Sequence, residues 1–416
     1  MDNTLKPPTR KLGKHVRILL FSVLLAIAFR SVGFSIIDIG LPNFIIDLSG
    51  SLFSYGLVRG IFNVMQSVFQ FPVAAASDKY GRRRIIIIAI GIYTLGTFLC
   101  FTAQNITQLI IYRAIQGSGA YTSILQAIVS DIYDEEEHGK GMGYYSLSMN
   151  IGYFGGIILG GYISSYLGFR NIFSISGVLI FISAVFLIVV FNTSNPQNIT
   201  TNSDLEKSAN MALNKRNIIL LLKEPQFGIA VFINSLRWFI FGGVVAYLVW
   251  VLQVFYKIDE LSSSYYLLLI VALYVCFVII SGKQLDTKGP RKMMLIGQAI
   301  AIFGGIPFFF GIIHIFLVFT IVTLFISIGL ALYDPAGATL ILNIIMKINP
   351  NLRGTGIGLN NAIGFFSSAI GPIVFSIIGE LSIFYPFYLI FFLILIAFVM
   401  TNFLISPERG SLISTE

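Results

Sequence analysis

The chain has 416 residues, of which 56% are hydrophobic and only 11% are charged, and its mean hydropathy is +0.86. A water-soluble globule of this length needs far more polar surface, so the composition excludes a soluble protein and indicates that lipid surrounds most of the chain. The formal net charge of +8 would also suit nucleic acid, but the basic residues are divided among separate loops, so we expect no nucleic-acid partner.

Apolar runs recur along the whole chain at lengths that suit membrane helices. A helix needs about 20 apolar residues to cross a hydrocarbon core of about 30 Å. Twelve segments meet this requirement, and the tenth is long enough that we expect it to include a loop. The predicted ranges are 16–41, 52–76, 83–103, 108–131, 143–166, 170–192, 226–254, 263–284, 292–313, 315–346, 355–379 and 384–405.

The distribution of Lys and Arg predicts the orientation of these spans. Of the 27 basic residues, 21 fall in the tails and in alternate loops, two (Arg170 and Lys257) fall on the other side, and four lie within spans. Because positively charged loops resist translocation, both termini are predicted to be cytoplasmic in a protein of the cell membrane. Residues 193–225 form a long polar segment, interpreted as a flexible cytoplasmic linker between an N-terminal bundle (1–192) and a C-terminal bundle (226–416).

A charged phrase occurs once in each half of the chain. SDKYGRRR, after the second predicted span, returns as LDTKGPRK after the eighth. The distance to an upstream arginine is repeated as well, because Arg30 precedes Asp78 by 48 residues and Arg237 precedes Asp286 by 49. This register indicates an internal duplication. The expected fold class is therefore an all-α membrane protein whose twelve transmembrane helices form two pseudo-symmetric six-helix bundles, with a substrate site between them.

The motifs resemble those of the major facilitator superfamily, over essentially the whole chain. The loop pattern Gly-x-x-x-Asp-Arg-x-Gly-Arg-Arg, with alanine for the leading glycine, is matched by Ala74, Asp78, Lys79, Gly81, Arg82 and Arg83. In the second half it is matched by Gly282, Asp286, Gly289 and Arg291. The fourth-span pattern Arg-x-x-Gln-Gly-x-Gly-Ala is matched by Arg113, Gln116, Gly117, Gly119 and Ala120. The resemblance implies the major facilitator fold and transport by alternating access.

The loop motif also has a physical interpretation. An acid at a helix end, facing the N-terminus of the next helix and nearby arginines, forms a charge–dipole latch. The resemblance implies that this latch stabilises the outward-facing state, whereas the alternative is that the charges only set the topology. The candidate gating residues are Asp78, Gly81, Arg82, Asp286, Gly289 and Arg291.

Four glycines of the fifth span are spaced for close helix packing. They are Gly152, Gly156, Gly160 and Gly161. The spacing resembles the antiporter motif Gly-x-x-x-Gly-Pro-x-x-Gly-Gly of twelve-helix drug–proton antiporters, with Ile157 at the proline position. The resemblance favours export, and the alternative is helix packing that carries no information about direction.

Charged side chains within spans are the strongest signal of a site, because each costs about 2.5–3.5 kcal/mol at the centre of an inserted helix. Arg30 and Arg237 lie near the middle of the first and seventh spans, where two guanidinium groups would attract an anion. Organophosphate–phosphate antiporters of the same superfamily carry arginines on these helices, but each arginine can instead pair within its own half.

The other candidate substrate-binding residues are Gln66, Trp238, Tyr247 and Asn360. Gln66 lies on a polar stripe of the second span that must line a cavity or the interface between the halves. The alternative for the two aromatic residues is packing or anchoring, and the alternative for Asn360 is a hydrogen bond between helices.

An acidic residue of the first span is the favoured proton carrier. Asp38 lies on the same helical face as Arg30 and about 12 Å further along, where it is predicted to cluster with Arg59 and Arg113. A carboxylate that alternates between an arginine and a dry cavity can couple proton binding to conformation. Asp334 in the tenth span is the second candidate, and static ion pairing is the simpler alternative.

No enzyme signature competes with a transport function. The sequence contains no Gly-x-x-x-x-Gly-Lys-Ser/Thr nucleotide loop, no paired-histidine metal motif and no nucleophile elbow, so we expect neither an enzyme nor a cofactor. The expected function is a monomeric secondary transporter in lipid that moves a small organic solute with a proton or counter-solute gradient, in a multidrug-like export. The alternatives are an organic-anion or phosphate-ester exchanger that uses Arg30 and Arg237, and a membrane sensor that binds without transport.

Overall fold

A computed structural model describes residues 14–132, 138–193, 215–310, 314–349 and 352–406, and all regular structure in these ranges is helical. The helices of the first half are α1 (Lys14–Asp47), α2 (Leu52–Tyr80), α3 (Arg82–Thr102), α4 (Ile106–Ser118), α5 (Thr122–Ile132), α6 (His138–Tyr162), η2 (Ile163–Leu167) and α7 (Asn171–Thr193). Those of the second half are α9 (Lys215–Lys223), α10 (Pro225–Trp250), η4 (Val251–Phe255), α11 (Glu260–Lys288), α12 (Pro290–Gly305), η5 (Ile306–Phe310), α13 (Phe316–Ile348), α14 (Arg353–Leu381) and α15 (Tyr385–Phe403).

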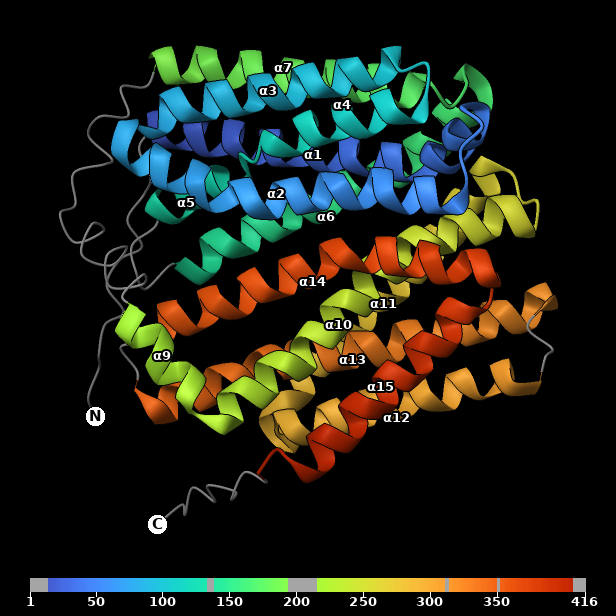
Figure 1. Cartoon of the computed structure of the whole chain (residues 1–416). Helices are drawn as coiled ribbons and strands as arrows, with labels where there is room; N and C mark the ends of the chain where they lie inside the picture. Colours follow the sequence, from blue (N-terminus) through green and yellow to red (C-terminus); the bar gives the residue numbers. More distant parts are fainter. Residues whose placement is uncertain (1–13, 133–137, 194–214, 311–313, 350–351, 407–416) are drawn as a thin grey trace.

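The long helices form two bundles that lie side by side (Figure 1). In the first bundle α1 packs against α6 and α7, and α4 packs against α2 and α3. In the second bundle α10 packs against α14, and α13 packs against α11 and α12. The predicted fold class, two six-helix bundles of a membrane protein, is confirmed. Of the segment predicted as a flexible linker (193–225), only its two ends are described, and α9 lies within it.

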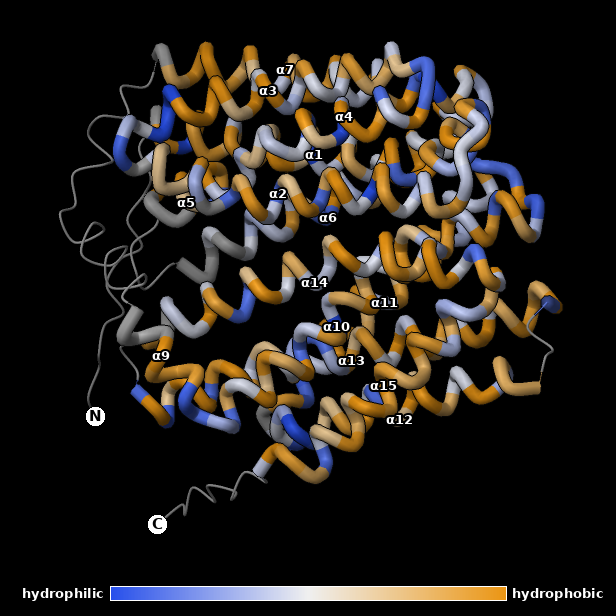
Figure 2. Tube along the Cα trace, viewed as in Figure 1, coloured by the Kyte–Doolittle hydropathy of each residue, from blue (hydrophilic) through white to orange (hydrophobic). Residues whose placement is uncertain are grey.

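Hydrophobic residues predominate along the bodies of the long helices, as lipid requires (Figure 2). Nine helices in the described ranges are long and apolar enough, by length and composition, to cross a membrane. The other three passages are α2, α6 and the pair α4 and α5. The pair is one predicted span that is interrupted at residues 119–121. α2 carries the polar residues Arg59 and Gln66, and α6 carries the glycine motif. α4 and α5 have 13 and 11 residues, so each alone is too short to cross a membrane.

The tenth predicted span differs from the expectation. α13 is one continuous helix of 33 residues from Phe316 to Ile348, so the loop expected within residues 315–346 is wrong. Pro335 lies inside this helix and removes one backbone hydrogen bond. Membrane helices tolerate such a proline because neighbouring helices and local adjustments satisfy the freed carbonyl.

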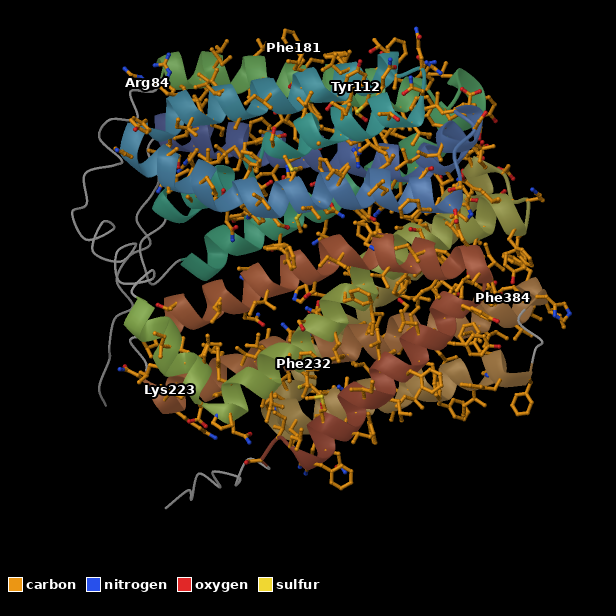
Figure 3. The ribbon with its side chains drawn as sticks, in the orientation of Figure 1. Arg84, Tyr112, Phe181, Lys223, Phe232 and Phe384 are labelled. Carbon is orange, nitrogen blue, oxygen red and sulfur yellow. The ribbon has the colours of Figure 1, made fainter. Side chains whose placement is uncertain are left out.

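The two copies of the charged loop have the same backbone form. Gly81 joins α2 to α3 with φ of 93°, and Gly289 joins α11 to α12 with φ of 75°. A side chain is strained in this left-handed region, so both turns require glycine. Arg84 on α3 and Lys223 on α9 lie at the same end of the molecule, and Phe384 lies at the opposite end (Figure 3). We call these the basic end and the far end.

Hydrogen bonds join the two bundles at the far end. Among the described residues, four of the hydrogen bonds across the interface run from the Asn43 amide to Glu260 (2.5 Å), the Phe53 N–H to Glu380 (2.9 Å), the Tyr55 hydroxyl to the Ala246 carbonyl (2.8 Å) and the Gln253 amide to the Ile39 carbonyl (2.9 Å). They connect the far ends of α1 and α2 to those of α10, η4, α11 and α14. We call this set of contacts the far-end seal.

Close backbone packing accompanies these hydrogen bonds. On α2, a Cβ atom at Gly56 would overlap Ser376 and would lie 2.5 Å from the Pro372 carbonyl oxygen of α14. On α6, a Cβ atom at Gly161 would lie 2.9 Å from the Ser264 Cβ of α11. Both glycines therefore allow close packing of the two bundles at the far end. The requirement is strict at Gly56, whose Cβ would meet a backbone carbonyl, whereas a Cβ at Gly161 would mainly meet the Ser264 side chain.

Candidate functional site

A buried ion pair joins α1 and α2 in the first bundle. The Arg59 guanidinium donates two hydrogen bonds to the Asp38 carboxylate, at 2.5 and 3.1 Å. The side chains are only 5% and 2% exposed. This bidentate contact is the strong form of an arginine–carboxylate pair, and it neutralises both charges inside the membrane.

A third charge of this region, Arg113 on α4, lies close to the pair without bonding to its carboxylate. Its Nε donates to the Val58 carbonyl (3.4 Å), and another guanidinium nitrogen donates to the Gln116 side chain (2.6 Å). Gln116 in turn donates to the Thr97 hydroxyl (2.8 Å), and the guanidinium carbon lies 4.3 Å from the Phe62 ring centre. Arg113 therefore contacts the backbone of Val58, the residue before Arg59, but it does not bond to Asp38.

A second ion pair lies between α10 and α13. A guanidinium nitrogen of Arg237 lies 2.8 Å from one carboxylate oxygen of Asp334, and the Tyr274 hydroxyl donates to the other oxygen at 2.8 Å. Arg237 is 6% exposed, whereas Asp334 is 33% exposed. A charge exposed to lipid inside a membrane span is very unfavourable, so this exposure indicates that the Asp334 carboxylate faces water and not lipid.

A chain of amides continues from this pair toward α14. The Arg237 Nε donates to Asn234 (3.2 Å), Asn234 donates to Asn360 (2.9 Å) and Asn360 donates weakly to Asn361 (3.4 Å). The guanidinium carbon also lies 4.9 Å from the centre of the Trp238 ring. Three of the predicted substrate-binding residues, Arg237, Trp238 and Asn360, therefore belong to one connected group in the second bundle.

Arg30 has different surroundings. One guanidinium nitrogen donates to the Gln66 side chain (3.2 Å), and Gln66 donates to the Gly117 carbonyl (3.2 Å). The guanidinium carbon lies 5.9 Å from the centre of the Tyr93 ring and 5.7 Å from that of Tyr121. No carboxylate of the described residues forms an ion pair with it. Its charge is thus held by neutral groups.

The remaining predicted residues lie toward the two ends of the bundles. Tyr247 donates to the Ile383 carbonyl (2.7 Å) near the far end, where its ring packs on two phenylalanines. Arg291, at the start of α12, donates to the carbonyls of Thr401 and Asn402 at the end of α15 (3.3 and 2.6 Å). The side chains of two gating candidates, Asp78 and Asp286, lie outside the described part of the structure, as do any contacts they make.

The glycines of the antiporter-like motif lie at helix contacts. Gly152, Gly156 and Gly160 face the backbone of α1, and a Cβ atom at any of them would be within about 3 Å of it. Gly161 faces α11 of the other bundle, as part of the packing at the far-end seal. The packing interpretation of the motif therefore has a direct structural basis.

Three tyrosines of the site were not among the residues that the sequence singled out. Tyr274 bonds to the exposed carboxylate, and Tyr93 and Tyr121 flank Arg30. Tyrosine is common in membrane spans, so composition alone gives no reason to select these three among 19. Only their tertiary positions, beside charges from other helices, identify them.

Two carboxylate–arginine pairs within the spans, one buried and one half-buried, inside a pair of six-helix bundles are typical of a polytopic membrane transporter. The family model described as Major Facilitator Superfamily matches residues 23–341 and 228–415. The chain belongs to this superfamily, and it is an integral membrane protein.

Relatives of this chain carry transport or resistance names. An uncharacterized transporter of Buchnera aphidicola subsp. Acyrthosiphon pisum is 30% identical over 254 residues, which are 56% of this chain and 64% of the relative. The inner membrane transport protein YajR of Escherichia coli is 28% identical over 37% of this chain and 34% of its own length. Both matches thus span less than two thirds of the relative. The class B tetracycline resistance protein of Escherichia coli is 24% identical over 86% of this chain and 88% of its own length.

Solved structures share the fold at low sequence identity. A bacterial homologue of the human lysosomal transporter Spinster, in an inward-facing and unoccupied conformation, superposes with a TM-score of 0.72 at 17% identity, over 89% of this chain and 83% of that chain. A D-xylose–proton symporter superposes with a TM-score of 0.72 at 14% identity, over 94% and 98% of the two chains. These similarities establish the major facilitator fold.

Proposed function

We propose that this protein is a secondary active transporter, and not an enzyme, that exports small organic solutes across the cell membrane in exchange for protons. The observation that carries the proposal is the half-buried Asp334 carboxylate, held by Arg237 and Tyr274 within a membrane span. An ionisable group inside a span is expensive and is typical of an ion or substrate pathway. The name of the tetracycline resistance relative supports export of organic solutes in a multidrug-like manner.

The far-end seal supports alternating access. If the basic end is cytoplasmic, as the positions of Lys and Arg predict, a seal at the far end closes the pathway toward the outside. Rocking of the two bundles, taken as residues 1–192 and 226–416, would then open the far end and close the basic end around one shared site. The Asp78 and Asp286 loops are the proposed latches of that second state.

The two carboxylates lie on different sides of the proposed site. Asp38 precedes Ile39, whose carbonyl accepts a hydrogen bond of the far-end seal, and Tyr55, one turn from Arg59, donates another. Protonation of Asp38 would free Arg59 and disturb both contacts, which couples proton binding to the seal. Asp334 is exposed while the far end is closed, so it exchanges protons from the basic end in this conformation.

Replacement of Asp334 with Asn tests proton coupling directly. We expect flux driven by a pH gradient to fall to the level of empty liposomes, because the amide carries no proton at this position. Exchange between equal pools of solute is expected to continue, because it needs no net proton movement. The measurement is flux in proteoliposomes loaded with pooled dyes and metabolites, with and without an imposed pH gradient. Unchanged pH-driven flux would reject Asp334 as a carrier.

A reversible cross-link tests whether the far-end seal must open. In a Cys276→Ser background, cysteines at Gly161 and Ser264 are expected to form a disulfide, since the Cβ atoms need only a small shift from 2.9 Å to about 3.5–4.5 Å. Oxidation should then stop flux, and reduction should restore it. Gly161→Cys alone is the control and should be insensitive to oxidation. Full flux in the cross-linked protein would contradict alternating access at this seal.

Two other functions remain as candidates. Exchange of organic anions is favoured by Arg30, which forms no ion pair with a described carboxylate, whereas Arg237 is paired with Asp334. A membrane sensor would bind a solute in the same site without moving it. Solute binding to the purified protein together with an absence of flux in liposomes would favour the sensor.

A further inference from the structure

The membrane interior of this protein has an excess of positive charge. Among the described residues that lie well inside the spans, four are arginines and two are aspartates: Arg30, Arg59, Arg113, Arg237, Asp38 and Asp334. The two aspartates neutralise Arg59 and Arg237 through direct ion pairs. Two positive charges are left, and they belong to Arg30 and Arg113.

Arg113 and Arg30 differ in how many hydrogen-bond partners their guanidinium groups have within the protein. Arg113 is 2% exposed and is fixed by a carbonyl, by the Gln116 side chain and by the Phe62 ring. Arg30 is only half-buried, and the one hydrogen bond described for its guanidinium goes to the neutral Gln66 amide. Its Nε is buried and has no hydrogen-bond partner among the described residues. Arg30 is therefore the charge that retains capacity for a ligand.

Two buried tyrosine rings lie next to this guanidinium, and their hydroxyl groups are unused. Tyr93 and Tyr121 are fully buried, their rings meet edge to face with centres 5.5 Å apart, and the guanidinium of Arg30 lies within 6 Å of both ring centres. Neither hydroxyl has a hydrogen-bond partner among the described residues. A buried polar group without a partner destabilises a protein, so a cluster of three such groups at one place is unusual.

All three unpartnered groups are donors. The Nε of Arg30 can only donate, and each tyrosine hydroxyl has a hydrogen to donate. A ligand that satisfies them must supply several acceptor oxygens, and one that also matches the unneutralised guanidinium must be negative. We propose, building on the transport function proposed above, that Arg30, Tyr93, Tyr121 and Gln66 form a subsite for an oxyanion group of the transported solute, a carboxylate or a phosphate.

This subsite lies in the first bundle alone. Arg237 belongs to the second bundle, where Asp334 already neutralises its charge. The anionic group is therefore recognised by one arginine and not by a clamp of two. The remainder of the solute extends toward the group around Trp238 and Asn360, which has aromatic and amide character and no net charge.

Thermal unfolding of the purified full-length protein in detergent tests the subsite without knowledge of the natural solute. The probes are benzoate and inorganic phosphate, with benzylamine as a cation of benzoate's size and chloride as a simple anion. A ligand that binds the folded state stabilises it by RT ln(1 + L/Kd), where L is the concentration of free ligand, so Tm rises with the logarithm of that concentration once it exceeds Kd. We expect benzoate or phosphate to raise Tm, and benzylamine and chloride to have no effect.

Variants assign the effect to the cluster. Arg30→Gln should lower the affinity for the anion, obtained from the concentration dependence of Tm, by about tenfold or more, because it removes a charge-assisted hydrogen bond. Arg170→Gln, which removes the same charge from an exposed residue at the far end, should respond as the parent does. The double variant Tyr93→Phe, Tyr121→Phe removes only two unpartnered hydroxyls. It should therefore fold at least as well as the parent while its response to the anion is several times weaker.

The outcomes distinguish a carboxylate from a phosphate as the bound group, and they distinguish failure of the subsite from failure of the transport proposal. A response to benzoate assigns the subsite to a carboxylate of an organic solute, and a response to phosphate alone assigns it to a phosphate group. A response to neither, an equal response to benzylamine, or a full response in Arg30→Gln would overturn the subsite. Anion binding without flux would overturn the transport proposal but support the subsite. Flux driven by a pH gradient without anion binding would support the transport proposal but overturn the subsite.

Discussion

Replacement of Asp38 with Asn is expected to lower the free energy of unfolding by about 3–5 kcal/mol, the usual effect of removing one partner from a buried ion pair. Arg59 would remain charged, because a guanidinium does not lose its proton in a protein, and it is only 5% exposed. The measurement is unfolding of the purified protein in detergent, followed by circular dichroism.

The double variant Asp38→Asn, Arg59→Gln is the matched control for this experiment. It removes both charges together, so most of the lost stability should return if the unpaired guanidinium is the cause. Asp47→Asn is a second control, because Asp47 and Arg170 form an exposed pair at 3.4 Å, worth at most about 1 kcal/mol. Equal losses for Asp38→Asn and Asp47→Asn would contradict the role of burial.

The same pair of variants separates stability from coupling. The double variant is expected to fold but to lose pH-driven flux, because the buried carboxylate that adjoins the far-end seal through Ile39 is gone. Retained pH-driven flux in the double variant would place proton coupling entirely at Asp334. The stability measurement and the flux measurement therefore answer different questions about one ion pair.

The sequence predicted the architecture well because lipid imposes strong rules. Span lengths, the loop charges and the repeated phrase around Gly81 and Gly289 each follow from the membrane or from duplication, and all twelve passages are found. The errors are local. Residues 119–121 interrupt the fourth span, and the tenth is one helix without the loop that its length predicted. This helix continues through Pro335 because neighbouring helices can satisfy a freed backbone group.

The partners of the buried charges were much harder to predict. The sequence shows that Arg30, Arg59 and Arg237 lie inside the membrane, but a span of 20 or more residues presents several faces, and one sequence does not show which face meets which helix. Arg237 pairs with Asp334, whereas Arg30 forms no ion pair with any carboxylate in the described ranges, and both findings depend on tertiary structure. They turn two apparently equivalent arginines into one neutralised residue and one that can hold an anion.

A larger residue at Gly56 is expected to prevent closure of the far-end seal. In Gly56→Val the new side chain would overlap Ser376 and would meet the Pro372 carbonyl of α14, both in the opposite bundle. Overpacking of this kind typically costs about 1–3 kcal/mol, which is enough to shift a two-state equilibrium roughly 5- to 150-fold toward the state in which the bundles are apart at this end.

The cross-link between Gly161→Cys and Ser264→Cys reports this shift without any solute. Its rate of formation should fall by about tenfold in Gly56→Val, because the cysteines meet only while the seal is closed. Gly91→Val on α3 is the matched control, since nothing lies within 4 Å of a Cβ atom there, and its cross-linking rate should equal that of the parent. An equal rate in Gly56→Val would mean that the seal does not depend on the close approach of α2 and α14.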